Sequence, residues 1–158
     1  MNVAIEISDT TRLDISTEMS KMLADEIILY IKTKNAQWNI DGADFYEKHK
    51  FFEAQFGQLD GIFDSVAERI RTIGHYAPGT LKAYLGMMHI NEATRAVNES
   101  QELFRELLKD HESIIMHLRE TIRSFGTEHQ YLSVNDFIAG LVETHEEMSW
   151  FLRSHGVI

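Results

Sequence analysis

The 158-residue chain carries a net charge of −10, is 44% hydrophobic and has no cysteine. The lack of cysteine excludes disulfides, zinc–thiolate sites and cysteine nucleophiles. The acidic balance argues against nucleic acid as a general partner, because DNA affinity needs clustered Lys and Arg. We therefore expect DNA binding to be weak or absent. No apolar run approaches the roughly 20 residues that span a bilayer, and no signal-peptide pattern opens the chain. A cytoplasmic protein without membrane contact is expected.

The composition predicts one domain made of long helices. A single proline and nine glycines leave long uninterrupted stretches, which favours helix over strand. Residues 1–15 alternate weakly between apolar and polar side chains, which predicts an extended N-terminal arm. The remaining residues, 16–158, are predicted to form the domain.

The first helix is predicted to run from Ser16, a suitable N-cap, to Gln37. It ends in the turn at residues 39–42. Its inward positions recur at helical spacing: Met19, Leu23, Ile27 and Tyr30.

The second helix, residues 44–73, has the clearest apolar pattern. Gly74 and Pro78-Gly79 close it. The steps of three and four are those of a bundle seam, and the seam comprises Phe45, His49, Phe52, Phe56, Leu59, Phe63, Val66, Ile70 and Ile73.

A long connection, residues 75–96, follows and carries a short helix at Leu81–Met88. A third helix is predicted over Val97–Phe125 and a fourth over Val134–Ser154. Their inward faces are Phe104, Leu107, His111, Ile114, Leu118 and Ile122 on the third, and Phe137, Leu141, His145, Met148 and Leu152 on the fourth. Four helices with one long middle crossover predict an all-α, ferritin-like four-helix bundle.

Two pairs of potential metal ligands lie on the second helix, His49 with Glu53 and Asp64 with Glu68. Side chains four apart on a helix are neighbours, so each pair could offer two ligands to one ion. The pairs begin 15 residues apart, which is roughly 22 Å of helix. One ion therefore cannot touch both pairs of one chain. If the pairs share an ion, two chains must run antiparallel, and the site exists only in an oligomer.

The same face of the helix allows a second interpretation. Four carboxylates and two glycines fall beside the apolar seam: Glu53, Asp60, Asp64, Glu68, Gly57 and Gly61. Glycine inside a helix costs about 1 kcal/mol against alanine, and it is tolerated more readily where another backbone must come close. Such a face suits an interface that closes around cations. It suits equally well a solvated acidic face whose carboxylates have partners one turn away.

An ordered series of short motifs resembles the Dps family of mini-ferritins. The series consists of Lys34–Ile40, Phe45, His49, Phe52-Glu53, Asp64–Ile70, the Gly74 turn and Glu143–Arg153. The resemblance covers nearly the whole chain from about residue 16, and it implies a hollow homo-oligomeric shell of twelve subunits, a dodecamer. It also implies that the shell oxidises ferrous iron, often with hydrogen peroxide, and stores the ferric mineral inside.

The resemblance also implies the ligands. His49 and Glu53 would bind iron from one subunit, and Asp64 and Glu68 from its two-fold mate. Glu68 would be the bridging or primary carboxylate, since iron in oxidative sites favours carboxylate and imidazole. The family has aspartate at the position of Glu53, so the charge is kept and the reach is longer.

Gln37 departs from the family, which has histidine immediately before the tryptophan. A glutamine carbonyl is a neutral, weaker donor than imidazole and cannot accept or relay a proton. One hypothesis is a ferroxidase that stores iron and protects against oxidative stress, with Gln37 as a weak metal ligand. The alternative is a shell whose oxidation site is impaired by Gln37, acting as a non-catalytic metal-sequestering or scaffold protein.

Three further residues are candidates for a role in the shell, and two of them, Trp38 and Asp136, have a role in the resemblance and also a plainer structural interpretation. Trp38 would absorb stray oxidising equivalents beside the iron site, or it anchors an interface. Asp136 would lie near the three-fold pores through which iron enters, or it is a carboxylate stabilised at a helix N-terminus. Glu47 would face the cavity and nucleate mineral.

The remaining histidines do not suggest a second di-iron arrangement. Larger ferritins hold iron inside one bundle with Glu-x-x-His on two helices, and none of the eight histidines has Glu three residues before it. His111 and His145 fall on apolar stripes. They are predicted to be core histidines whose ring nitrogens are hydrogen-bonded.

Overall fold

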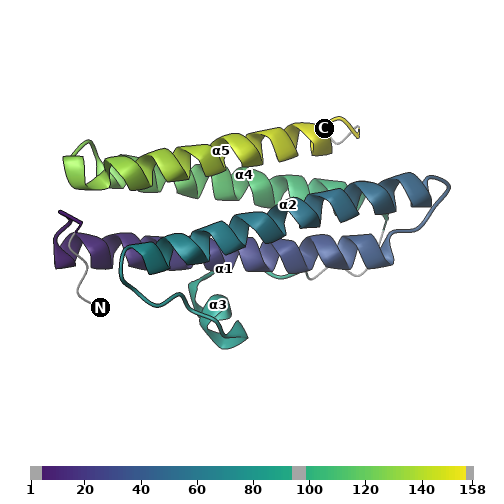
Figure 1. Ribbon diagram of the computed structural model, residues 1–158. Coiled ribbons are helices and arrows are strands. Elements are labelled where there is room, and N and C mark those ends of the chain that lie inside the picture. Colours follow the sequence, from purple (N-terminus) through teal and green to yellow (C-terminus); the bar gives the residue numbers. More distant parts are fainter. Residues whose placement is uncertain (1–4, 94–98, 156–158) are drawn as a thin grey trace.

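Four long helices lie side by side in the computed structural model, which describes residues 5–93 and 99–155 (Figure 1). They are α1 (Asp9–Asn39), α2 (Phe45–Thr72), α4 (Ser100–Phe125) and α5 (Leu132–Arg153). Two short elements accompany them, α3 (Leu81–Met87) and the 3-10 helix η1 (His129–Tyr131). Within the described ranges there is no strand. None of the helices in these ranges is long and apolar enough to cross a membrane.

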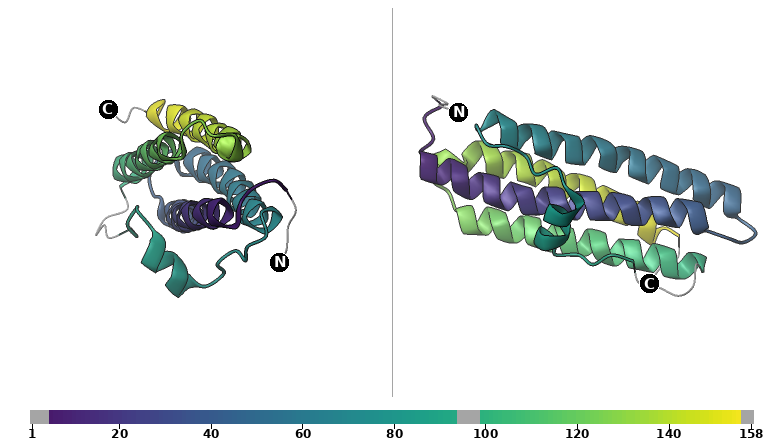
Figure 2. Two further views of the ribbon diagram at one scale, coloured as in Figure 1. Left: turned by 90° about the vertical axis from the view of Figure 1, so that its left-hand side faces the viewer. Right: turned by 90° about the horizontal axis from the view of Figure 1, so that it is seen from below.

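The connectivity is that of a ferritin-like bundle. α1 pairs with α2 and α4 pairs with α5, each as an antiparallel hairpin (Figure 1). α2 and α4 run in the same direction, so the chain between them returns along the length of the bundle. On the way, α3 packs across the outside of α1 (Figure 2). The predicted all-α fold, with a long middle crossover that carries a short helix, is confirmed.

The N-terminal arm is shorter than predicted. α1 begins at Asp9, because the Ser8 side chain accepts a hydrogen bond from the Thr11 backbone N–H and caps the helix. Ser16, the predicted cap, is buried inside α1. The apolar–polar alternation of residues 1–15 was misleading, since Ile15 and Met19 already lie on the buried helix face. Residues 9–15 are therefore helical, and residues 1–4 lie outside the described part.

The core forms along the predicted seams. Phe52 of α2 is fully buried, and its ring centroid lies 4.9 Å from that of Phe104 on α4. Phe45 is an exception, because it begins α2 beyond the end of the core and remains 44% exposed. At the other boundaries, α5 begins at Leu132 rather than Val134. The predicted start of the third helix, Val97, lies outside the described residues, and α4 begins at Ser100 in the structure.

A chain of buried polar groups crosses the middle of the bundle. Nε2 of His145 donates to the Glu26 carboxylate at 2.8 Å, and Nδ1 of His145 lies 2.9 Å from Nδ1 of His111. All three side chains are at most 1% exposed. Burial holds the pKa of His111 well below its usual range, and the neighbouring His145 lowers it further. The prediction that these two histidines are hydrogen-bonded core residues is confirmed, whereas their partner Glu26 was not foreseen.

The polar chain predicts a non-additive pair of substitutions. In His145→Leu, the Glu26 carboxylate loses its donor inside the core, and we expect the free energy of unfolding to fall by about 3–5 kcal/mol. In Glu26→Leu/His145→Leu no unpaired carboxylate remains, so the free energy of unfolding should fall by less in the double variant than in His145→Leu alone. Urea unfolding at a fixed protein concentration measures both.

The exposed pair formed by Arg119 and Glu146 provides the matched control. Glu146→Gln should change the free energy of unfolding by less than about 1 kcal/mol. If the double variant were destabilised as much as His145→Leu, or more, Glu26 and His145 would not stabilise the bundle as a pair.

Candidate metal centre

The first ligand pair is positioned by the α1–α2 hairpin. His49 lies in the second turn of α2, and its Nδ1 is 3.0 Å from the main-chain carbonyl oxygen of Gln37 near the end of α1. A carbonyl oxygen only accepts, so Nδ1–H donates, and Nε2 is the ring nitrogen that is left for another partner. Metal-binding histidines are oriented in this way, with one nitrogen hydrogen-bonded to the protein and the other left for the metal. His49 is therefore arranged as a ligand through Nε2.

Glu53, one turn further along α2, is held by a lysine. Its Oε2 lies 2.6 Å from Nζ of Lys50, and both side chains are about half exposed. The hydrogen bond from Lys50, followed by the positive charge of Lys50, lowers the pKa of Glu53. The carboxylate is thus ionised at neutral pH and can attract a cation, which must displace Lys50 to be bound. Lys50 was not among the predicted site residues, although its spacing of three from Glu53 on a helix is a signal for an ion pair.

Gln37 lies at the same end of the α1–α2 hairpin as His49 and Glu53. Its side chain is only 6% exposed, and Oε1 has no hydrogen-bond partner among the described residues. A buried amide oxygen without a partner is costly in a folded protein, so such an atom calls for an explanation. Trp38, the next residue, is 69% exposed, which places it on the surface of the single chain. Its predicted role in trapping oxidising equivalents stays a prediction.

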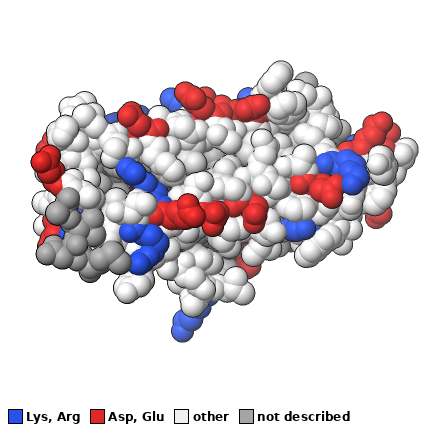
Figure 3. Space-filling view, in the orientation of Figure 1, with Lys and Arg blue, Asp and Glu red and all other residues white. Residues whose placement is uncertain are grey.

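The second ligand pair lies on an open face of α2. Asp64 and Glu68 are both exposed, and Figure 3 shows acidic side chains in a row along the middle of this side of the molecule. A Cβ atom added at Gly57 or Gly61 would meet nothing within 4 Å. Among the described residues, no atom of another segment would therefore contact a Cβ at these two glycines, and there is space on this face for another molecule.

The two predicted ligand pairs are thus separate in one chain. The structure brings together Gln37, His49 and Glu53, but it does not bring Asp64 and Glu68 to them. Across residues 5–93 and 99–155, no three His, Asp or Glu side chains gather in an arrangement that could hold a metal ion. This is the result that the 15-residue spacing on a straight helix requires.

The two remaining sequence candidates lie apart from the ligand pairs. Asp136 is exposed on α5 and lines a shallow groove with Gly61 and Ser65 of α2. It lies beyond the first turn of α5, which weakens the interpretation as a carboxylate at a helix N-terminus. Glu47 is exposed in the first turn of α2. Neither the pore role of Asp136 nor the cavity role of Glu47 is tested by a single chain.

Known proteins share this fold and sequence along nearly the whole chain. The ferritin-like domain family matches residues 17–156. A low temperature-induced protein of Nostoc sp. is 33% identical, over 96% of this chain and 85% of its own length. The DNA protection during starvation protein of Helicobacter pylori is 29% identical, over 87% of this chain and 94% of its own length.

A solved structure agrees with these relatives. DpsC from Streptomyces coelicolor superposes with a TM-score of 0.89 at 26% identity, covering 100% of this chain and 92% of its own. The matched family spans the bundle from the third turn of α1 to the end of α5. The chain belongs to the Dps family, within the ferritin-like superfamily.

Proposed function

We propose that the protein binds and oxidises ferrous iron at sites shared between two subunits and stores the ferric product inside a shell. The observation that carries this proposal is the pair of incomplete ligand sets on one exposed face of α2. His49 and Glu53 offer an imidazole and a carboxylate, and Asp64 and Glu68 offer two carboxylates. This mixture is the donor set that iron favours in oxidative sites. Membership of a family of iron-binding mini-ferritins supports the choice of iron.

A two-fold axis completes the proposed site. When two α2 helices run antiparallel, residue 49 of one chain meets residue 64 of the other, and the same contact repeats on the other side of the axis. Each dimer then holds two equivalent sites. The open glycine positions, Gly57 and Gly61, lie between the ligand pairs and allow the partner helix to approach closely.

The proposed reaction joins two ferrous ions with one hydrogen peroxide molecule. Each ferrous ion gives up one electron, the two electrons enter the O–O bond, and the bond breaks. Two protons from solvent complete the products, which are two ferric ions and two water molecules. The carboxylates favour ferric over ferrous iron because they are anionic. Peroxide consumed in this way cannot react with free iron, which is the basis of protection against oxidative stress.

Gln37 is proposed as a weak ligand in the position where the family has histidine. Its Oε1 is buried and without a hydrogen-bond partner in the described part of the chain, as expected of a donor reserved for a cation. The alternative is that the amide leaves the second iron position too weak for catalysis. The protein would then be a non-catalytic metal-sequestering or scaffold shell.

The shell is proposed to be a homododecamer, as the family resemblance implies, and to work in the cytoplasm. DNA is not proposed as a partner, although the Helicobacter pylori relative is named for DNA protection. The net charge of −10 disfavours phosphate binding.

Replacing Glu68, the proposed bridging or primary carboxylate, should weaken the iron site. In assembled Glu68→Gln, we expect ferrous iron affinity to fall by at least about ten-fold, because a neutral amide replaces a charged ligand. Anaerobic titration with ferrous iron measures the affinity. Glu147→Gln, an exposed carboxylate on α5, is the control and should bind as the wild type does. Equal binding by Glu68→Gln and the wild type would contradict the proposed ligand set.

Variants at Gln37 decide between the ferroxidase and the impaired shell. We expect the wild type to oxidise iron with peroxide faster than a protein-free solution, Gln37→Leu to be slower, and Gln37→His to be at least as fast. The reason is that leucine removes the donor oxygen, whereas histidine strengthens the donor. Stopped-flow absorbance at matched iron and peroxide concentrations measures the rates. If only Gln37→His exceeds the protein-free rate, the wild-type shell is not a ferroxidase.

A further inference from the structure

A polar cavity of about 490 Å³ opens between α1 and α4, away from the α2 ligand pairs. Its walls carry three carboxylates and two imidazoles, from Asp14, Glu18, Glu120, His89 and His117. His89 comes from the segment after α3, and His117 from the middle of α4. The crossover thus brings together two histidines that lie far apart in the sequence. Neither belongs to the site proposed above.

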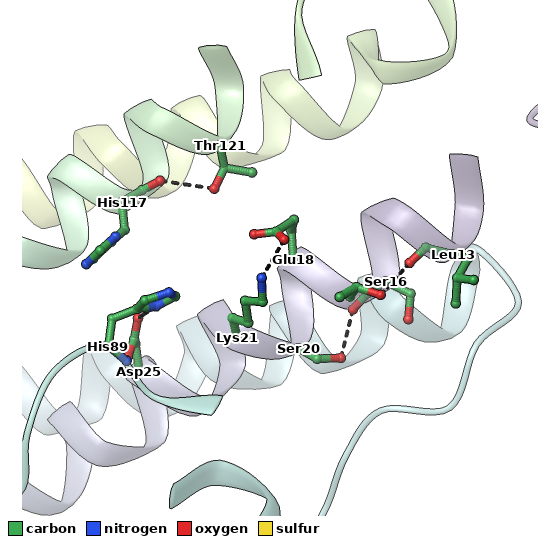
Figure 4. A network of polar contacts seen from close by, with 10 residues as sticks. Leu13, Ser16, Glu18, Ser20, Lys21, Asp25, His89, His117 and Thr121 are labelled. Carbon is green, nitrogen blue, oxygen red and sulfur yellow. Dashed lines mark hydrogen bonds and ion pairs between the residues drawn. The ribbon is translucent and has the colours of Figure 1, made fainter. Parts of the chain in front are cut away.

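Asp25 of α1 fixes the orientation of His89. Its carboxylate, which is 3% exposed, accepts the backbone N–H of His89 at 2.6 Å and that of Ile90 at 3.2 Å. Its second oxygen lies 3.0 Å from Nδ1 of His89 (Figure 4). A carboxylate accepts, so Nδ1–H donates, and Nε2 is the ring nitrogen that is left for a metal ion. This carboxylate–histidine arrangement is the one that supports histidines bound to metal ions.

His117 lies directly against the oriented ring. The two ring centroids are 4.1 Å apart and the planes are inclined by 26°. Both side chains are partly exposed on the cavity wall (Figure 4), so His117 can turn its ring edge toward Nε2 of His89 without moving the core. Two histidines inside an acidic cavity attract a cation, because their ring nitrogens can bind a metal ion and the carboxylates give the cavity a negative electrostatic potential.

We propose that His89 and His117 bind one divalent transition-metal ion of the imidazole-preferring kind, represented by Zn²⁺ and Co²⁺. Two imidazoles do not fill the coordination sphere. Among the described residues no third His, Asp or Glu side chain stands with them in an arrangement that could hold a metal ion. Water therefore takes the remaining positions, and Glu120, or Glu18 once it is released from its ion pair with Lys21, would have to turn toward the ion to join them. The site is therefore weaker than a structural zinc site with four protein ligands.

The test uses assembled protein that carries Asp64→Asn and Glu68→Gln, so that the proposed iron site does not compete. Zn²⁺ is titrated calorimetrically, and Co²⁺ is followed by its visible ligand-field bands. His89→Ala and His117→Ala are each added to this background. Two backbone hydrogen bonds to Asp25 remain in His89→Ala, so its fold should persist, and far-UV circular dichroism in EDTA checks this. His129→Ala, an exposed histidine in η1, is the matched control.

We expect about one Zn²⁺ per chain in the background protein, and a loss of affinity of about ten-fold or more in His89→Ala and in His117→Ala. The control should bind as the background does. Absence of zinc binding in the background, or binding that depends on only one of the two histidines, would overturn the shared site. The outcome is separable from the iron proposal, because Asp64 and Glu68, the carboxylates of one half of the proposed iron site, are already replaced.

Discussion

The rigidity of α2 is the constraint on which the account of this protein depends. An α-helix advances about 1.5 Å per residue, and hydrogen bonds along its length prevent Asp64 from folding back toward His49. Two ligand pairs on one such helix can serve one ion only if a second chain supplies the other half. The exposed carboxylates, and the open space at Gly57 and Gly61, are features that fit a site shared by two chains. In the proposed assembly, the partner subunit packs on this open face.

The bundle supports that face by fixing the helices beneath it. The buried chain Glu26–His145–His111 joins α1, α5 and α4, and it prevents these helices from sliding past one another. At the end of the α1–α2 hairpin, the Gln37 carbonyl orients His49. Preorganisation of this kind matters because a metal ligand must be held in place before the ion arrives. The stability of the core and the geometry of the proposed site therefore arise from the same packing.

The sequence predicted the fold well because apolar periodicity reports directly on burial. Phe52 and Leu59 are buried as their spacing predicted. The crossover was predicted from the long segment, residues 75–96, between the second and third helical patterns. The start of α1 was wrong, since one polar cap such as Ser8 outweighs a weak alternation of residues. Contacts between distant segments, such as Glu26 with His145 and Asp25 with His89, have no periodic signal. Whether the two ligand pairs meet depends on how two subunits pack together. The sequence of one chain identifies each pair but not the contact between them.

Co-expression of two complementary variants tests the split site most directly. His49→Ala/Glu53→Ala lacks one half of each site, and Asp64→Asn/Glu68→Gln lacks the other, so each shell alone should bind no iron at this site. In mixed shells, one of the two sites at each hetero-interface is whole. With random mixing, the account predicts about a quarter of the wild-type iron binding. Mixed shells that bind no more iron than their inactive parents would contradict the claim that two subunits share the site.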